Sequence, residues 1–116
     1  MSPALPFLLI SWSSVMCNKS MIKVLSILNR LKGLRLDFHR ELTTDWLLFQ
    51  PDSVIVGHIK AVHRTTSFLF DDAESVRDDI EPSTFRSVMD AISAFEELLI
   101  YKLEDALKKQ IVSNLN

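Results

Sequence analysis

The sequence predicts an all-α fold, an antiparallel bundle of three long helices to which the N-terminal segment could add a fourth. Apolar residues recur at intervals of three and four over long stretches, which is the spacing of one helix face. Pro51 and Pro82 interrupt this pattern and leave only short connections, which favour antiparallel neighbours. The 116 residues include only two glycines, fewer than a fold built on tight turns needs.

The first predicted helix runs from Ser20 to Gln50. Gly33 would allow a bend within it, since glycine costs about 1 kcal/mol relative to alanine in a helix. Pro51 disfavours the helical conformation for Gln50, so we expect the helix to end there. The residues expected to face the core are Val24, Leu28, Leu31, Leu34, Phe38, Leu42, Trp46 and Phe49.

The second predicted helix spans residues 53–80. Pro51 is tolerated at a helix start, and Asp52 or Ser53 could supply the capping oxygen. The β-branched residues 54–56 would also suit a strand, but the chain offers that strand no partner, so a helix is favoured. Residues 71–74 match a capping box, so the segment is either one helix or two that meet near Phe70. Its apolar face comprises Ile55, Ile59, Val62, Thr66, Leu69, Ala73, Val76 and Ile80.

The third predicted helix, residues 83–115, has the most regular pattern and contains neither glycine nor proline. Its apolar face comprises Phe85, Val88, Ile92, Phe95, Leu99, Leu103, Ala106 and Ile111. Leu98, Ile100 and Tyr101 lie beside this face, so the helix is more apolar than one buried stripe requires. The N-terminal segment or a second copy of the chain could cover the excess, and a homodimer is therefore an open expectation.

The predicted domain organisation is one helical bundle, residues 20–116, preceded by an apolar segment, residues 1–20. The apolar run from Pro3 to Trp12 is too short to cross a bilayer, which needs about 20 residues. It also lacks the preceding basic residue of a signal peptide. We expect this segment to dock on the bundle, or to lie upstream of a true start at Met21. No membrane span and a cytoplasmic location follow as expectations.

Charge is unevenly distributed along the chain. Residues 1–50 carry six basic and three acidic side chains, whereas residues 51–82 carry three basic and seven acidic ones. The two segments could simply attract each other when packed. An acidic patch could also steer a basic partner protein to the surface, and its members are Asp71, Asp72, Glu74, Asp78, Asp79 and Glu81. The basic side chains that could instead track a phosphate backbone are Lys23, Arg30, Lys32, Arg35 and Arg40.

Motifs for catalysis or metal binding are weak. His58 and His63 are five residues apart, about 140° around a helix, so they cannot chelate one metal together. Arg35 and His39 could face a phosphodiester, but the favoured interpretation is two solvated side chains on the basic first helix. We therefore expect no catalytic residues, no metal and no cofactor. The sequence favours a small non-enzymatic protein-interaction module, such as an adaptor, a regulatory subunit or an immunity- or antitoxin-like neutraliser. The alternative is a helical nucleic-acid-binding regulator that uses the basic first helix.

Overall fold

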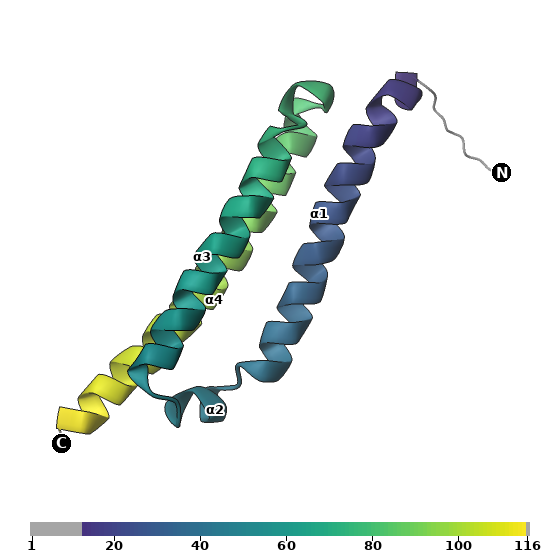
Figure 1. Ribbon diagram of the computed structural model, residues 1–116. Coiled ribbons are helices and arrows are strands. Elements are labelled where there is room, and N and C mark those ends of the chain that lie inside the picture. The colour runs from purple at the N-terminus through teal and green to yellow at the C-terminus, as the bar shows by residue number, and fades with distance from the viewer. Residues whose placement is uncertain (1–12, 116) are drawn as a thin grey trace.

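The computed structural model describes residues 13–115, with the side chains of residues 19–115 except Thr44. Its elements are α1 (Ser13–Glu41), α2 (Thr44–Leu48), α3 (Asp52–Glu74), the 3-10 helix η1 (Arg77–Asp79) and α4 (Pro82–Leu115). The three long helices pack side by side, and α3 runs antiparallel to both α1 and α4 (Figure 1). The molecule is a rod of 63 × 29 × 17 Å. The predicted all-α bundle of three long helices is confirmed.

The core is one cluster with members from α1 to α4, and its α3 and α4 side chains follow the predicted stripes closely. The fully buried side chains of the two helices include Ile55, Val62, Leu69, Ile92 and Leu103. Ile111, predicted to face the core, is 47% exposed, because the last turns of α4 extend past α2 (Figure 1). Burial of a large aliphatic side chain contributes about 1.5–3 kcal/mol, so this paired stripe is the main source of stability.

Helix α1 covers one side of the α3–α4 pair and continues through Gly33 as a single helix. Val24, Ile27 and Leu31 are buried, and the Phe38 ring packs edge-on against Phe95 with centroids 6.2 Å apart. The prediction that Leu28 faces the core is wrong, because Leu28 is 38% exposed. Either Ile27 or Leu28 satisfies the helical interval between Val24 and Leu31, so spacing alone could not separate them.

The first helix ends at Glu41, nine residues before the predicted end at Gln50. Thr43 adopts an extended backbone, and its Oγ1 accepts a hydrogen bond from the Trp46 amide at 3.2 Å, which starts α2. As a result Trp46 is 38% exposed and Phe49 is 85% exposed, so the prediction that these two residues face the core is wrong. Leu47 is the buried residue of α2, and α4 holds this turn through Gln110, whose Nε2 donates to the carbonyl oxygens of Leu47 at 3.0 Å and of Gln50.

Helix α3 differs from the prediction at both ends. It begins after Pro51 without a side-chain capping bond, so the predicted cap by Asp52 or Ser53 is wrong. It also continues through Glu74, so residues 71–74 are not a capping box. The buried Ala73 and Val76 extend the apolar stripe past this point, and that packing decides the outcome. The segment is therefore one α-helix followed by the 3-10 turn.

The predicted N-terminal segment divides at Ser13, where α1 begins. Ser20 is buried in the bundle. Residues 1–12 lie outside the described part of the chain. The two expectations for them, docking on the bundle and a true start at Met21, therefore stay predictions. None of the helices described here combines the length and the apolar character that crossing a membrane requires.

Candidate functional site

The predicted acidic patch lies at one end of the rod, on the last turn of α3, on η1 and on the connection to α4. Asp72 is half-buried and the other five members are exposed. Two members have partners within the chain, since Asp79 Oδ2 accepts a hydrogen bond from Ser20 Oγ at 3.2 Å and Glu74 pairs with Arg77 at 3.2 Å. Part of this charge is therefore already compensated inside the molecule.

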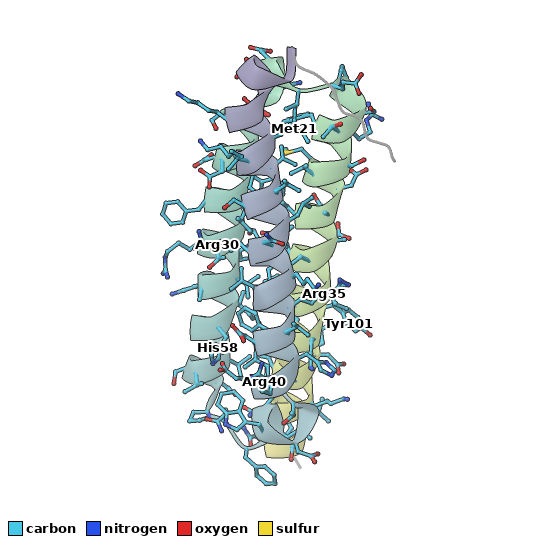
Figure 2. The ribbon with its side chains drawn as sticks, turned by 90° about the vertical axis from the view of Figure 1, so that its right-hand side faces the viewer. Met21, Arg30, Arg35, Arg40, His58 and Tyr101 are labelled. Atoms are coloured by element: carbon cyan, nitrogen blue, oxygen red, sulfur yellow. The ribbon has the colours of Figure 1, made fainter. Side chains whose placement is uncertain are left out.

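The predicted basic residues lie on different sides of α1. Lys23 and Arg30 face α3, where they line a hollow together with Asp72, and Lys23 Nζ donates to Ser75 Oγ at 3.0 Å. Lys32 and Arg35 face α4 instead; Figure 2 shows Arg30 and Arg35 on opposite flanks of α1. Lys32 follows Lys23 by nine residues, or about two and a half helical turns, so the two side chains lie on opposite sides of α1. The sequence grouped these side chains, but the fold divides them.

Arg40, the fifth predicted basic residue, forms an ion pair with Asp37 at 3.7 Å on the exposed surface of α1. Exposed pairs of this kind contribute about 0–1 kcal/mol. Arg40 therefore belongs to neither of the two groups.

A groove between α1 and α4 is the surface feature with the clearest chemical character. It encloses about 480 Å³, and it is lined by Lys32, Arg35, Leu36, Phe38, His39, Leu98, Leu99 and Lys102. Four of these residues are apolar, and Leu36 and Leu98 are each 56% exposed. The other four are basic, from both helices. We call this set the α1–α4 groove.

The groove continues into a second apolar stripe on α1, beside the buried one. Met21, Leu25 and Leu28 are 39%, 55% and 38% exposed, and their spacing of four and three places them on one face. Leu36 follows Leu28 by eight residues and continues this face toward the groove. Figure 2 shows Met21 beside α4, on the flank of α1 that also carries Arg35. The apolar surface predicted beside the buried stripe of α4, at Leu98, therefore has a counterpart on α1. The sequence pattern did not distinguish this second stripe of α1 from the buried one.

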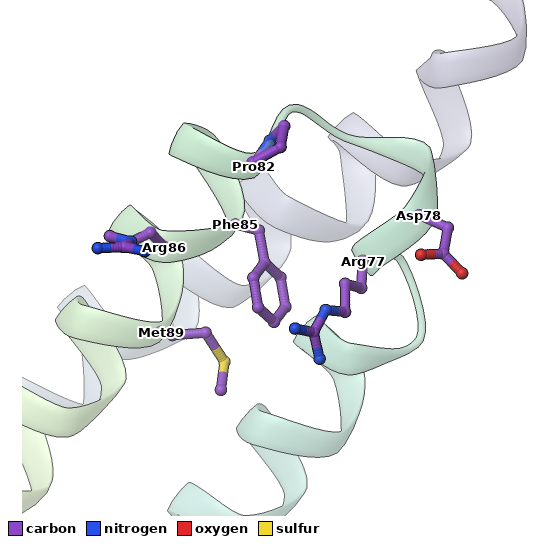
Figure 3. A pocket seen from close by; sticks show the side chains of 6 residues that line it. All are labelled: Arg77, Asp78, Pro82, Phe85, Arg86 and Met89. Carbon is purple, nitrogen blue, oxygen red and sulfur yellow. The ribbon is translucent and has the colours of Figure 1, made fainter.

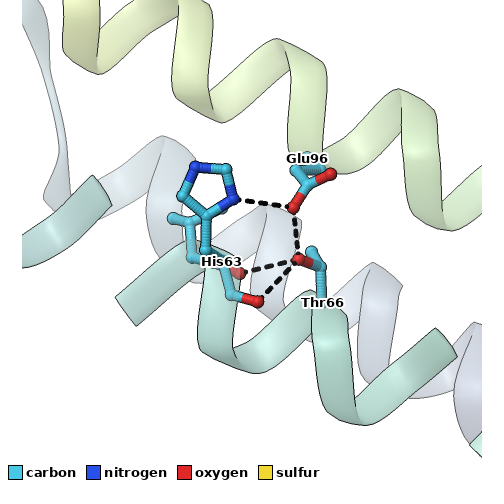
Figure 4. A network of polar contacts seen from close by, with 4 residues as sticks. His63, Thr66 and Glu96 are labelled. Atoms are coloured by element: carbon cyan, nitrogen blue, oxygen red, sulfur yellow. Dashed lines mark hydrogen bonds and ion pairs between the residues drawn. The ribbon is translucent and has the colours of Figure 1, made fainter. Parts of the chain in front are cut away.

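The histidines do not converge on a common site. The His58 ring packs edge-on against Trp46 with centroids 5.7 Å apart, whereas His63 Nδ1 lies 3.0 Å from Glu96 Oε2. The same Glu96 oxygen accepts a hydrogen bond from Thr66 Oγ1 at 2.6 Å (Figure 4). Thr66 is fully buried, so a substrate cannot reach its hydroxyl. This cluster joins α3 to α4 and has the geometry of a structural contact.

A second hollow, of about 480 Å³, lies at the turn between α3 and α4 (Figure 3). The Arg77 guanidinium sits 4.9 Å from the centre of the Phe85 ring, and the same group pairs with Glu74. Cation–π contacts at exposed sites are worth about 0.5–1 kcal/mol. Arg77 is therefore engaged within the chain, and this hollow is explained by the packing of the turn.

Among the described residues, His, Cys, Asp and Glu form no cluster of three or more that could hold a metal ion. The α1–α4 groove remains the candidate site, because exposed Leu36 and Leu98 gather there with basic side chains that form no ion pair within the described part of the chain. No known protein family, curated protein or solved structure matches this chain.

Proposed function

We propose that this chain is a small non-enzymatic module that binds another protein, and that the α1–α4 groove receives a helix of that partner. Such a module would be an adaptor, a regulatory subunit or an immunity- or antitoxin-like neutraliser. The observation that carries the proposal is the exposure of Leu36 and Leu98 in a groove rimmed by basic side chains.

The shape of the groove supports a helical occupant. It lies between two long helices, so an added helix would take the fourth position of a four-helix bundle. Binding an amphipathic helix by its apolar face is a recurrent mode of peptide recognition. Full burial of a leucine is worth about 1.5–3 kcal/mol, and Leu36 and Leu98 each have more than half of that still to gain.

Charge argues for a partner protein over a second copy. A symmetric dimer through this groove would place the same surface on both sides of the interface. Such an interface would bring the basic side chains Lys32, Arg35 and Lys102 of both copies together with no acidic lining residue among them, and like charges in an interface are unfavourable. A dimer in light scattering that dissociates on Leu36→Asp would contradict this part of the proposal.

The proposal is tested with two synthetic amphipathic helices of about 18 residues that share their leucines and differ only in polar residues, one acidic and one basic. Binding to the full chain is measured by fluorescence anisotropy. At least one peptide should bind, and the double variant Leu36→Asp with Leu98→Asp should abolish binding. Phe68→Asp is the matched control, because Phe68 is 59% exposed on α3, away from the groove. Binding that survives the groove variant, or that is lost equally in the control, would contradict the proposal.

The alternative function, nucleic-acid binding by α1, is tested in parallel. Under it, a DNA duplex should bind in a gel shift, the affinity should fall steeply with salt, and Lys32→Glu with Arg35→Glu should abolish the shift. Such a result without peptide binding would replace our proposal.

A further inference from the structure

We propose that the helix received by the α1–α4 groove is acidic, with glutamate or aspartate on both flanks of its apolar stripe. This inference rests on the proposed function and specifies the chemistry of the partner. It follows from the charges around the groove and from where the chain places its own carboxylates.

The rim of the groove is basic on both sides. Lys32, Arg35 and His39 line it from α1, and Lys102 lines it from α4. None of the eight lining residues is acidic. At about 1.5 Å per residue, Lys32 and Arg35 lie about 5 Å apart along α1, close to one helical turn. An occupying helix therefore meets positive charge on both flanks, from Lys32 and Arg35 on one side and from Lys102 on the other.

Two acidic residues of the helices that form this groove, Asp37 and Asp105, have ion pairs of their own. Asp37 pairs with Arg40 at 3.7 Å, and Asp105 pairs with Lys109 at 3.1 Å. Among the ion pairs formed within the described part of the chain, none involves Lys32, Arg35 or Lys102. These three side chains therefore keep their capacity to bind carboxylates of another molecule.

The opposite flank of α1 provides an internal comparison. There the hollow lined by Lys19, Lys23 and Arg30 also contains Asp72 of α3, so the bundle supplies its own acidic side chain. On the α4 flank none of the described residues that line the groove is acidic. The basic residues of α1 that face α3 therefore have an acidic neighbour within the bundle, whereas those that face α4 have none among the lining residues. The α4 side is also the one with the exposed leucines.

The geometry specifies the pattern of the bound helix. Apolar residues at intervals of three and four would contact Leu36 and Leu98, and acidic residues on one flank would meet Lys32 and Arg35 while those on the other flank meet Lys102. Interfacial charge pairs of this kind mainly set specificity and association rate. We therefore expect the acidic helix to be preferred and its preference to weaken with added salt.

The test compares the acidic and basic peptides defined above on the full-length chain. The acidic peptide should bind at least about tenfold more tightly, and the difference should shrink at high salt. Lys32→Glu with Arg35→Glu should remove or reverse the preference. Lys60→Glu with Arg64→Glu is the control, because it makes the same charge change on exposed residues of α3 and should leave the preference intact.

The outcomes separate the two proposals. If the basic peptide binds as tightly as the acidic one, and both are lost on Leu36→Asp with Leu98→Asp, the inference about charge is overturned while the proposed function stands. If neither peptide binds, both are overturned. Binding to phosphatidylglycerol vesicles that requires Lys32 and Arg35, with no binding of either peptide, would assign the groove to a lipid surface and would also overturn both.

Discussion

Thr66 of α3 and Glu96 of α4 form a hydrogen bond of 2.6 Å that crosses the best-packed interface of the bundle (Figure 4). Thr66 Oγ1 also lies 3.0 Å from the carbonyl oxygen of Val62, but a hydroxyl has one proton and donates it to one acceptor at a time. The short distance is typical of a hydroxyl bonded to a carboxylate. A buried polar residue in the apolar stripe is therefore satisfied by a side chain of the next helix.

This hydrogen bond predicts how much stability the protein loses when the Thr66 hydroxyl is removed. Thr66→Val preserves shape and should lower the free energy of unfolding by about 1–2 kcal/mol, because Glu96 loses a charge-assisted partner but stays 26% exposed and can recruit water. The measurement is urea unfolding followed by circular dichroism. Thr65→Val is the control for helix propensity, and an equal loss in both variants would contradict the assigned role.

The second prediction concerns the two candidate core positions of α1. Ile27→Ala should cost about 2–4 kcal/mol because Ile27 is 2% exposed, whereas Leu28→Ala should cost less than about 1 kcal/mol because its side chain is 38% exposed. The two variants are compared by urea unfolding under the same conditions. The opposite order would mean that α1 packs with the face predicted from the sequence.

The third prediction concerns the clamp between α4 and the α2 turn. Gln110→Ala removes the donor to the Leu47 and Gln50 carbonyl oxygens. Amide hydrogen exchange in residues 43–50 should become faster while the α3–α4 core keeps its protection, because the lost bonds are local. Lys108→Ala, on the exposed side of the same turn of α4, is the control. Unchanged exchange at α2 would show that Leu47 burial alone holds the turn.

The fourth prediction is a stabilising substitution. Gly57 lies inside α3 and is exposed, and no atom lies within 4 Å of the position that a Cβ would take. Gly57→Ala should therefore raise the free energy of unfolding by about 0.5–1 kcal/mol, because alanine restricts the unfolded chain and favours the helix. Thermal unfolding checks this. Gly33→Ala in α1 should behave alike, since its Cβ position is equally open.

The sequence predicted the helices of the α3–α4 pair more accurately than it predicted α1 and α2. In α3 and α4 a single dominant stripe, such as Ile55, Val62 and Leu69, leaves one choice of buried face. In α1, Ile27 and Leu28 offered two faces of equal spacing. In α2, the cap formed by Thr43 interrupts a pattern that otherwise continues to Phe49.

The sequence alone predicted only part of the candidate site. Leu98 stood out as apolar surface beyond the main stripe, but its counterpart Leu36 did not. The basic residues of α1 were identified as one group, although Lys23 and Lys32 point to different helices. The sequence shows the sign and the spacing of the charged residues. Which residue lies next to each of them depends on how another helix packs against α1.

What the sequence determined by itself is therefore the set of long helices, their order and the buried stripes of α3 and α4. Periodicity and proline positions are local properties, and they act on each segment before it meets another. Only the tertiary structure decided which stripe of α1 is buried and which basic side chains lie beside Asp72. It also brought Leu36 and Leu98, far apart in the chain, to one groove. Those outcomes depend on how three rods fit together, because each side chain takes the environment that its neighbouring helix presents.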